Sequence, residues 1–248
     1  MEKYWIDINC DLGEGFPDDA LLMPYISSAN IACGAHAGSD WVMQQTIQLA
    51  IASGVKIGAH PGFDDPENFG RKEQHLSELQ LTDLIQSQVV RLQKIALSFG
   101  VSLHHVKPHG ALYNMSAASP KIARVIAMAI KELDASICLY GLSNSHSIEQ
   151  ATAIGLNCCN EVFADRRYRA DGSLLPRSYP HALITNPEES CRQVAQMVKQ
   201  QSVIADTGMA IPVLAETICI HGDALGAATM AAHIFHHLQL QNIGLEKN

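Results

Sequence analysis

Charged residues are scarce in this chain: they make up 17% of the 248 positions, and the formal net charge is −8. Hydrophobic residues make up 47%, so the composition is not that of a disordered chain. A negative net charge does not favour nucleic-acid binding, which calls for a basic face. We therefore expect a small-molecule ligand.

Sequence features of export and membrane insertion are also missing. The N-terminal stretch MEKYWIDINCDLGEG contains no apolar core of the signal-peptide type, and no uncharged run approaches the length that spans a bilayer. The seven cysteines are an odd number and lie mostly in apolar runs, which is typical of reduced core thiols and not of a disulfide framework. These features predict a cytoplasmic protein.

Common nucleotide and metal motifs do not occur. The sequence contains no G-x-x-x-x-G-K-[ST] pattern, no G-x-G-x-x-G after a strand-like run and no H-E-x-x-H. A nucleotide site built by this chain alone is therefore not predicted.

Short β-rich runs alternate with helical patterns along the whole chain. Seven such runs occur, at residues 4–10, 29–36, 55–60, 103–109, 137–141, 156–164 and 217–223. The alternation predicts a parallel sheet covered by helices. The length favours a closed parallel β/α barrel, with an open doubly wound sheet as the alternative. No linker interrupts the chain, so we expect residues 1–248 to form a single domain.

Helix boundaries are marked by cap signals. Ser77 with Gln80 resembles a capping box, and Asp223 is placed to cap the last helix. The other signals are Ser119-Pro120 and Asn186-Pro187 at helix starts and Gly54 and Gly100 at helix ends.

Ionisable groups end six of the seven β-rich runs. In a β/α fold, the loops after the carboxyl ends of the strands build the site. Asp7, Asn9 and Asp11 alternate along the first run, which places them on one face of an extended chain. The residues that end the later runs are His36, His60, Lys107, His109, Glu161, Asp165, His221 and Asp223.

Imidazoles and carboxylates at one barrel mouth would perturb each other's pKa values, as general acid/base chemistry requires. A single strand-end histidine is more often structural, and it is the repetition that favours a shared site. The Lys107 ammonium could polarise a carbonyl or hold an anion while His109 passes a proton. The alternative is a lysine that pairs with a carboxylate only to hold a loop.

Arginines concentrate in two irregular segments that could act as lids. Residues 163–180 contain Arg166, Arg167, Arg169 and Arg177, and residues 61–75 contain Arg71. Arginine suits bidentate binding of carboxylate or phosphate. The alternative is a solvated loop in which acidic neighbours balance these charges.

Some side chains are also of the type that binds metal ions. Asp11, His36, His60 and His221 offer carboxylate and imidazole groups, but their spacing matches no metal motif, so no particular metal is predicted. His233, His236 and His237 on the last helix are expected at its surface or at a subunit contact, for example in a homo-oligomer.

Longer motifs resemble the LamB/YcsF (lactam utilisation) family. They are DINCDLGEG, SANIACGAHAG, IGAHPGFDD, FGRK, HVKPHGALYN, EVFADRRY and CIHGD, in this order between Asp7 and Asp223. The resemblance implies a seven-stranded barrel related to the polysaccharide deacetylases. It also implies the role of the A subunit, with the B and C subunits as partners, in a 5-oxoprolinase that uses ATP to open 5-oxoproline to glutamate. Where the family usually reads HAGDP, this chain has Ser39-Asp40, so Asp40 is not counted as a site residue.

Residue roles can be proposed within that activity. We expect Asp11, His36, His60 and His109 to transfer protons, Lys107 and Arg166 to stabilise negative charge, and Glu161, Asp165, His221 and Asp223 to orient them. The residues expected to contact substrate are Asn9, Asn30, Arg71, Tyr113, Arg166 and Arg177. ATP is expected to bind with or on a partner subunit. Two alternatives stay open: a self-sufficient metal-dependent deacetylase or amidase, and a non-catalytic substrate-binding subunit.

Overall fold

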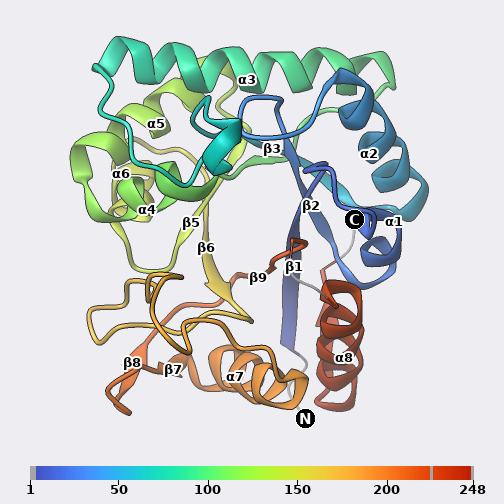
Figure 1. Ribbon diagram of the computed structural model, residues 1–248, viewed down its shortest axis with the longest axis vertical. Coiled ribbons are helices and arrows are strands. Elements are labelled where there is room, and N and C mark those ends of the chain that lie inside the picture. The colour runs from blue at the N-terminus through green and yellow to red at the C-terminus, as the bar shows by residue number, and fades with distance from the viewer. Residues whose placement is uncertain (1–3, 224–225, 247–248) are drawn as a thin grey trace.

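A closed barrel of parallel strands forms the centre of the molecule in the computed structural model, which describes residues 4–223 and 226–246 (Figure 1). The barrel strands are β1 (Tyr4–Leu12), β2 (Ser28–Ala32), β3 (Lys56–His60), β4 (His105–Val106), β5 (Cys138–Leu142), β6 (Cys158–Phe163) and β9 (Thr217–Ile220). Closure is made by β1, where Asn9 lies opposite Ser28 of β2 on one side and Cys219 of β9 on the other. The predicted seven-stranded β/α barrel is confirmed, and the open doubly wound sheet is not observed.

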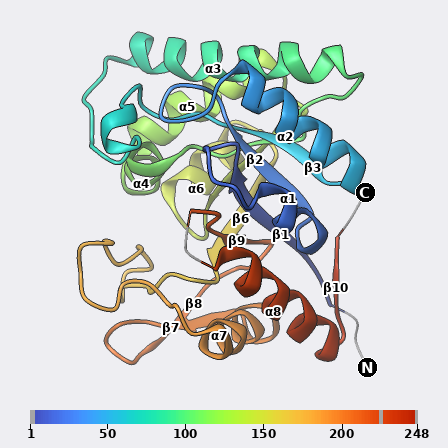
Figure 2. The same ribbon diagram turned by 45° about the vertical axis from the view of Figure 1, so that its right-hand side comes forward.

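Helices surround the strands, as Figures 1 and 2 show. The longer helices are α2 (Asp40–Ser53), α3 (Glu78–Ser98), α4 (Gly110–Ala118), α5 (Pro120–Leu133), α6 (His146–Ala153), α7 (Pro187–Gln200) and α8 (Ala227–Leu240). The short ones are α1 (Asp19–Leu22), η1 (Met23–Tyr25) and η2 (Pro66–Asn68). The last two long helices, α7 and α8, pack side by side. No helix of the described residues is both long and apolar enough to cross a membrane.

Most of the predicted helix boundaries are found in place. Ser77 and Gln80 form the capping box of α3. Ser119 and Asn186 accept hydrogen bonds from backbone N–H groups at the starts of α5 and α7, and Gly54 ends α2 with φ +63°. The prediction that Asp223 caps the last helix is wrong. Helix α8 begins at Ala227, after Gly226 in the left-handed conformation, and the Asp223 carboxylate contacts arginines instead.

Three short strands were not predicted. Strands β7 (Ser202–Ile204) and β8 (Ala210–Pro212) form an antiparallel hairpin, and β10 (Ile243–Leu245) pairs with the first residues of β1. Each has three residues and only one that is buried, so no apolar run marks it in the sequence. The hairpin lies beside α7 (Figure 1) and also contacts the loop after β5, where Asn144 donates to the carbonyl of Pro212.

The barrel interior is polar along one face of β1. Asp7 Oδ1 accepts hydrogen bonds from the hydroxyls of Ser27 and Ser28 at 2.8 and 2.6 Å, and its Oδ2 accepts one from Thr217 at 2.5 Å. The residues of β1 that alternate with Asp7, Asn9 and Asp11 are buried in the hydrophobic core; they are Ile6, Ile8, Cys10 and Leu12. The predicted alternation of Asp7, Asn9 and Asp11 therefore separates a polar interior from an apolar layer beneath the helices.

Gly58 of β3 faces this interior, and its position allows a stability prediction. A Cβ at Gly58 would overlap the ring of His105, which is fully buried and stacked on Tyr140 with ring centroids 4.1 Å apart. Gly58→Ala is therefore expected to lower the free energy of unfolding by about 3 kcal/mol or more.

Gly54→Ala is the matched control. A Cβ there meets no atom within 4 Å and is opposed only by the positive φ, so it should cost about 1 kcal/mol. Urea unfolding of both variants measures the difference. A smaller loss for Gly58→Ala than for Gly54→Ala would contradict this account of the interior.

Candidate functional site

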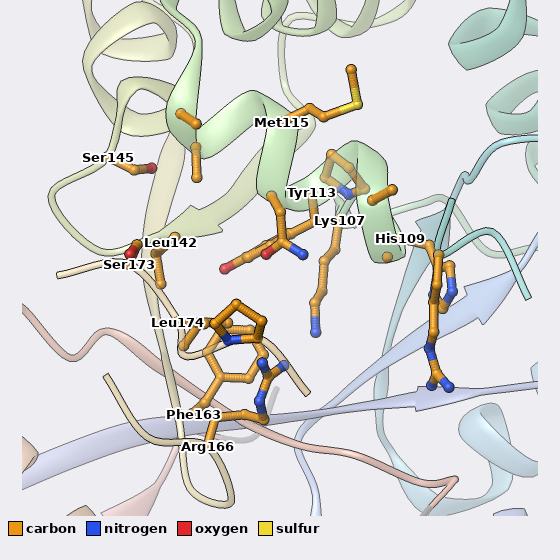
Figure 3. Close-up of a pocket in the computed structure, with 18 of the residues that line it drawn as sticks. Lys107, His109, Tyr113, Met115, Leu142, Ser145, Phe163, Arg166, Ser173 and Leu174 are labelled. Carbon is orange, nitrogen blue, oxygen red and sulfur yellow. The ribbon is translucent and has the colours of Figure 1, made fainter. Parts of the chain in front are cut away.

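The carboxyl ends of the barrel strands open into one cavity of about 870 Å³. Residues from most strand ends and from the two irregular segments line it, and Figure 3 shows part of this lining. The predicted site residues that line it are Asp11, His60, Arg71, Lys107, His109, Tyr113, Arg166, Arg177, His221 and Asp223. His36, Glu161 and Asp165 lie directly behind these residues and contact them.

Lys107 is the buried cation of the site. Its Nζ lies 2.9 Å from Asp11 Oδ1 and 2.9 Å from Glu161 Oε1. Burial alone would lower the pKa of Lys107, but the adjacent carboxylates outweigh burial and hold that pKa well above its ordinary value. The side chain is therefore an ammonium at neutral pH. Figure 3 shows it extended into the cavity, with Phe163 and Arg166 on the facing side.

Asn9 and Asn30, which were predicted to contact substrate, do not line the cavity. Both are fully buried beneath it. Asn30 Nδ2 donates to Asn9 Oδ1 and to Asp11 Oδ1, each at 2.7 Å, and Asn9 Oδ1 also accepts from Lys107 Nζ at 3.3 Å. Their amides are thus used inside the barrel, where they hold Asp11 and Lys107 in place.

Three histidines meet around Glu14. Glu14 Oε1 lies 3.3 Å from His36 Nε2, 3.9 Å from His60 Nε2 and 3.4 Å from His109 Nδ1. Burial, followed by the charges of Asp11 and Asp223, raises the pKa of Glu14 well above its ordinary value. Glu14 was not predicted, although it follows the first strand in the DLGEG motif, only three positions after Asp11.

A histidine–aspartate pair stands on the other side of the mouth. His221 Nδ1 lies 2.9 Å from both oxygens of Asp165, and the ring stacks on Phe163 with centroids 5.4 Å apart. Burial alone would raise the pKa of Asp165, but His221 and Arg177 outweigh it and lower that pKa. An aspartate that fixes one ring nitrogen leaves the other free to exchange a proton, which is the arrangement of a general base.

Both irregular segments reach the mouth through arginines. Arg71, from the segment after β3, and Arg177, from the segment after β6, both pair with Asp223, at 3.3 Å for Arg177 Nη1. Burial, followed by the charge of Arg177, lowers the pKa of Arg166 to about 10. Arg166 Nε is buried and has no hydrogen-bond partner among the described residues.

The other notable residues have structural contacts. Arg167 binds Glu189 Oε1 at 2.6 Å and the carbonyl of His181. An acidic neighbour thus balances its charge, as in the alternative stated for these arginines. Asp40 pairs with Arg91 on the outer surface. Tyr113 lines the cavity beside Lys107, and burial together with Glu161 raises its pKa, so the phenol keeps its proton.

Two groups of side chains among the described residues have the composition of metal ligands. One contains Glu14, His36, His60 and His109, and the other contains Asp11, Cys219 and His221. Of the possible metal ligands identified from the sequence, His36 and His60 belong to the first group. Asp11 and His221 belong to the second. His233 and His236 are exposed on α8, as predicted, and His237 is half-buried.

The fold is a β/α barrel of the kind found in a solved deacetylase. A deacetylase described as T48, solved with substrate, superimposes with a TM-score of 0.53 over 98% of this chain and 87% of its own, at 13% identity. This likeness concerns the fold alone.

Residues 6–248 match the LamB/YcsF family, so the chain belongs to that family. The A subunit of the 5-oxoprolinase of Tolumonas auensis is 48% identical over 234 residues, which cover 92% of this chain and 93% of that protein. The lactam utilization protein of Thermus thermophilus superimposes with a TM-score of 0.92 at 37% identity, covering 98% of this chain and 99% of its own.

The buried charges around Lys107 generate a stability prediction. Lys107→Met leaves Asp11 and Glu161 without their cation, so the free energy of unfolding should fall by about 3–5 kcal/mol. Lys121→Met is the control, because this exposed ammonium lies 3.0 Å from Glu78 and should contribute less than about 1 kcal/mol. Urea unfolding at neutral pH gives both values. Equal losses would show that the buried pairing of Lys107 contributes no more than a surface ion pair.

Asp165 generates a pH prediction. Because its folded-state pKa is lowered from 3.8, its contribution to stability is present above that value and is lost as the pH falls through the lower one. The stability difference between the wild type and Asp165→Asn should therefore be largest near neutral pH and shrink below about pH 4. Thermal unfolding across this range measures it, with the exposed Asp64→Asn as control. A difference that stays constant into acid would refute the lowered pKa.

Proposed function

We propose that this chain is the A subunit of an ATP-dependent 5-oxoprolinase and supplies the groups that hydrolyse the lactam amide of 5-oxoproline to L-glutamate. The observation that carries the proposal is its similarity, over nearly the whole length, to proteins named as the A subunit of 5-oxoprolinase. A cavity that gathers carboxylates, imidazoles and cations at the strand ends supports it. The expected compartment is the cytoplasm.

The chemistry explains why such a mixture of groups is needed. The amide of an unstrained five-membered lactam is a weak electrophile. Transfer of the terminal phosphoryl group of ATP to the lactam oxygen, with release of ADP, would make the ring carbon more electrophilic. A water molecule that loses a proton to a general base then attacks this carbon, and the ring C–N bond breaks as a general acid protonates the nitrogen, which leaves an acyl phosphate. A second water hydrolyses the acyl phosphate to the glutamate carboxylate and inorganic phosphate.

The positions of the side chains suggest how these roles divide. His221, held by Asp165, would take a proton from water, in place of the orienting role expected from the sequence. Lys107 and Arg166 face each other across the cavity (Figure 3) and would stabilise negative charge on the reacting oxygen. Arg71 and Arg177 at the mouth suit the carboxylate of 5-oxoproline.

ATP binding is proposed to involve the partner subunits. The sequence has no P-loop pattern. Its relatives are named as one lettered subunit of 5-oxoprolinase, and such a name calls for further subunits, which we expect to be B and C. The nucleotide would then bind on a partner or between subunits, with the lactam reaching the barrel mouth.

A second candidate is a metal-dependent amidase or deacetylase that acts without ATP. The observation that favours it is the group of Glu14 with three histidines beside the cavity. It differs from the first candidate in requiring a metal ion but neither ATP nor partner subunits.

Glutamate release from 5-oxoproline separates the two candidates. We expect release only when the purified chain, the partner subunits and ATP are all present, with ADP formed in proportion. Release by the chain alone without ATP would favour the amidase. No release with partners that are active when combined with a homologue of this chain would refute the proposal.

Variants of the same assembly test the residue roles. His221→Ala should lower kcat by about 100-fold or more, because it removes the proposed general base. The control is His233→Ala, since His233 is exposed on α8 and its loss should leave kcat unchanged. Equal activity of the two variants would remove His221 from the mechanism.

A further inference from the structure

Glu14, His36, His60 and His109 form a compact group in which ring nitrogens of two histidines lie 2.9 Å from each other. These side chains lie at or just after the ends of four consecutive barrel strands, and their ligand atoms are all within 4.8 Å of one another. Three of them line the cavity, and His36 lies behind, with its ring stacked on His109 at a centroid distance of 3.7 Å.

Backbone carbonyls fix the proton positions on two of these rings. His60 Nδ1 lies 2.8 Å from the carbonyl oxygen of Lys107, and His109 Nε2 lies 2.8 Å from that of Phe69. A carbonyl oxygen only accepts, so both of these nitrogens carry the hydrogen. In the neutral rings, the lone pairs are therefore on His60 Nε2 and His109 Nδ1.

These two lone pairs point toward each other. His109 Nδ1 lies 2.9 Å from His60 Nε2, a distance at which two acceptors repel unless a proton or another cation lies between them. Asp11 Oδ2 lies 3.4 Å from the same nitrogen of His60 and adds a negative charge that attracts such a cation.

A metal ion would satisfy the same atoms. Histidine ligands of metals commonly donate the other ring N–H to a carbonyl, as both rings do here. A tetrahedral ion with bonds of about 2.0–2.1 Å has ligand–ligand distances of about 3.3–3.4 Å. Glu14 Oε1 lies 3.3 Å from His36 Nε2 and 3.4 Å from His109 Nδ1, and the two contacts of His60 Nε2, at 2.9 Å to His109 and 3.9 Å to Glu14, lie on either side of that range. The His36 ring is stacked on His109 and has to rotate to direct Nε2 at the same ion.

We propose that Glu14, His36, His60 and His109 bind one divalent first-row transition-metal ion such as Zn²⁺. Three imidazoles with one carboxylate suit such an ion better than Mg²⁺ or Ca²⁺, which prefer oxygen ligands. The inference stands apart from the proposed reaction, because it concerns binding and not turnover.

The second group of possible ligands is a poorer site. The Lys107 ammonium already lies 2.9 Å from Asp11 Oδ1 and 3.1 Å from Cys219 Sγ. A cation between these atoms would have to displace Lys107 or repel it. The ion is therefore assigned to the Glu14 group alone.

Metal binding to the full-length chain tests the inference without any assay of activity. Chelator-treated protein is titrated with Zn²⁺ by calorimetry and with Co²⁺ by its visible ligand-field absorption, and bound metal is counted by elemental analysis. One ion per chain is expected, with Co²⁺ bands of a nitrogen- and oxygen-ligated site. Absence of stoichiometric binding of both ions would overturn the proposal.

Paired variants locate the ion. Glu14→Gln and His109→Gln keep the side-chain volume and should each weaken Zn²⁺ binding by about 100-fold or more. His221→Ala, from the second group, and His233→Ala, on the surface, should leave it unchanged. Circular dichroism and thermal unfolding establish that each variant is folded, and His36→Gln replaces any that is not. Unaltered affinity in the Glu14 and His109 variants, or its loss in His221→Ala, would overturn the assignment.

Discussion

The contact of the Lys107 ammonium with Asp11 and Glu161 is the interaction on which the rest of the site depends. Two carboxylates and one ammonium are almost fully buried at the floor of the cavity, and none of them would be stable there alone. Asn9 and Asn30 hold this cluster from below, so the polar interior supports the cavity floor. The barrel must close for these groups to meet, because Asp11 lies in β1, Lys107 directly follows β4 and Glu161 lies in β6.

The mouth divides into two halves on either side of Lys107. On one side, Glu14 and three histidines form a compact group in which burial is the main influence on the pKa values of Glu14, His36 and His109. On the other side, His221 is fixed by Asp165 and lines the cavity together with Arg166 and Arg177. A small anionic amide placed between them would have cations at one end and groups able to activate water beside it, as the proposed function requires.

The sequence predicted the barrel because short β-rich runs alternate with helical patterns along the chain, and the family resemblance supplied the number of seven strands. It predicted that Asp7, Asn9 and Asp11 lie on one face of the first strand. It did not predict which of them line the cavity, because alternation gives no information on how far a residue lies from the barrel mouth. Glu14 was missed because it lies in a loop, where no periodicity marks it. The prediction that Asp223 caps α8 was wrong because that helix begins only at Ala227, after Gly226 in the left-handed conformation. Strands β7, β8 and β10 were missed because three residues form no pattern.

Asp223 joins two segments that are about a hundred positions apart in the chain, since Arg71 and Arg177 bind the same carboxylate. Any anion that enters the cavity competes with Asp223 for these two guanidinium groups. Binding of a negatively charged molecule is therefore linked to the breaking of the ion pairs that Asp223 makes with the two segments. The entrance would respond to the charge of what enters as well as to its size.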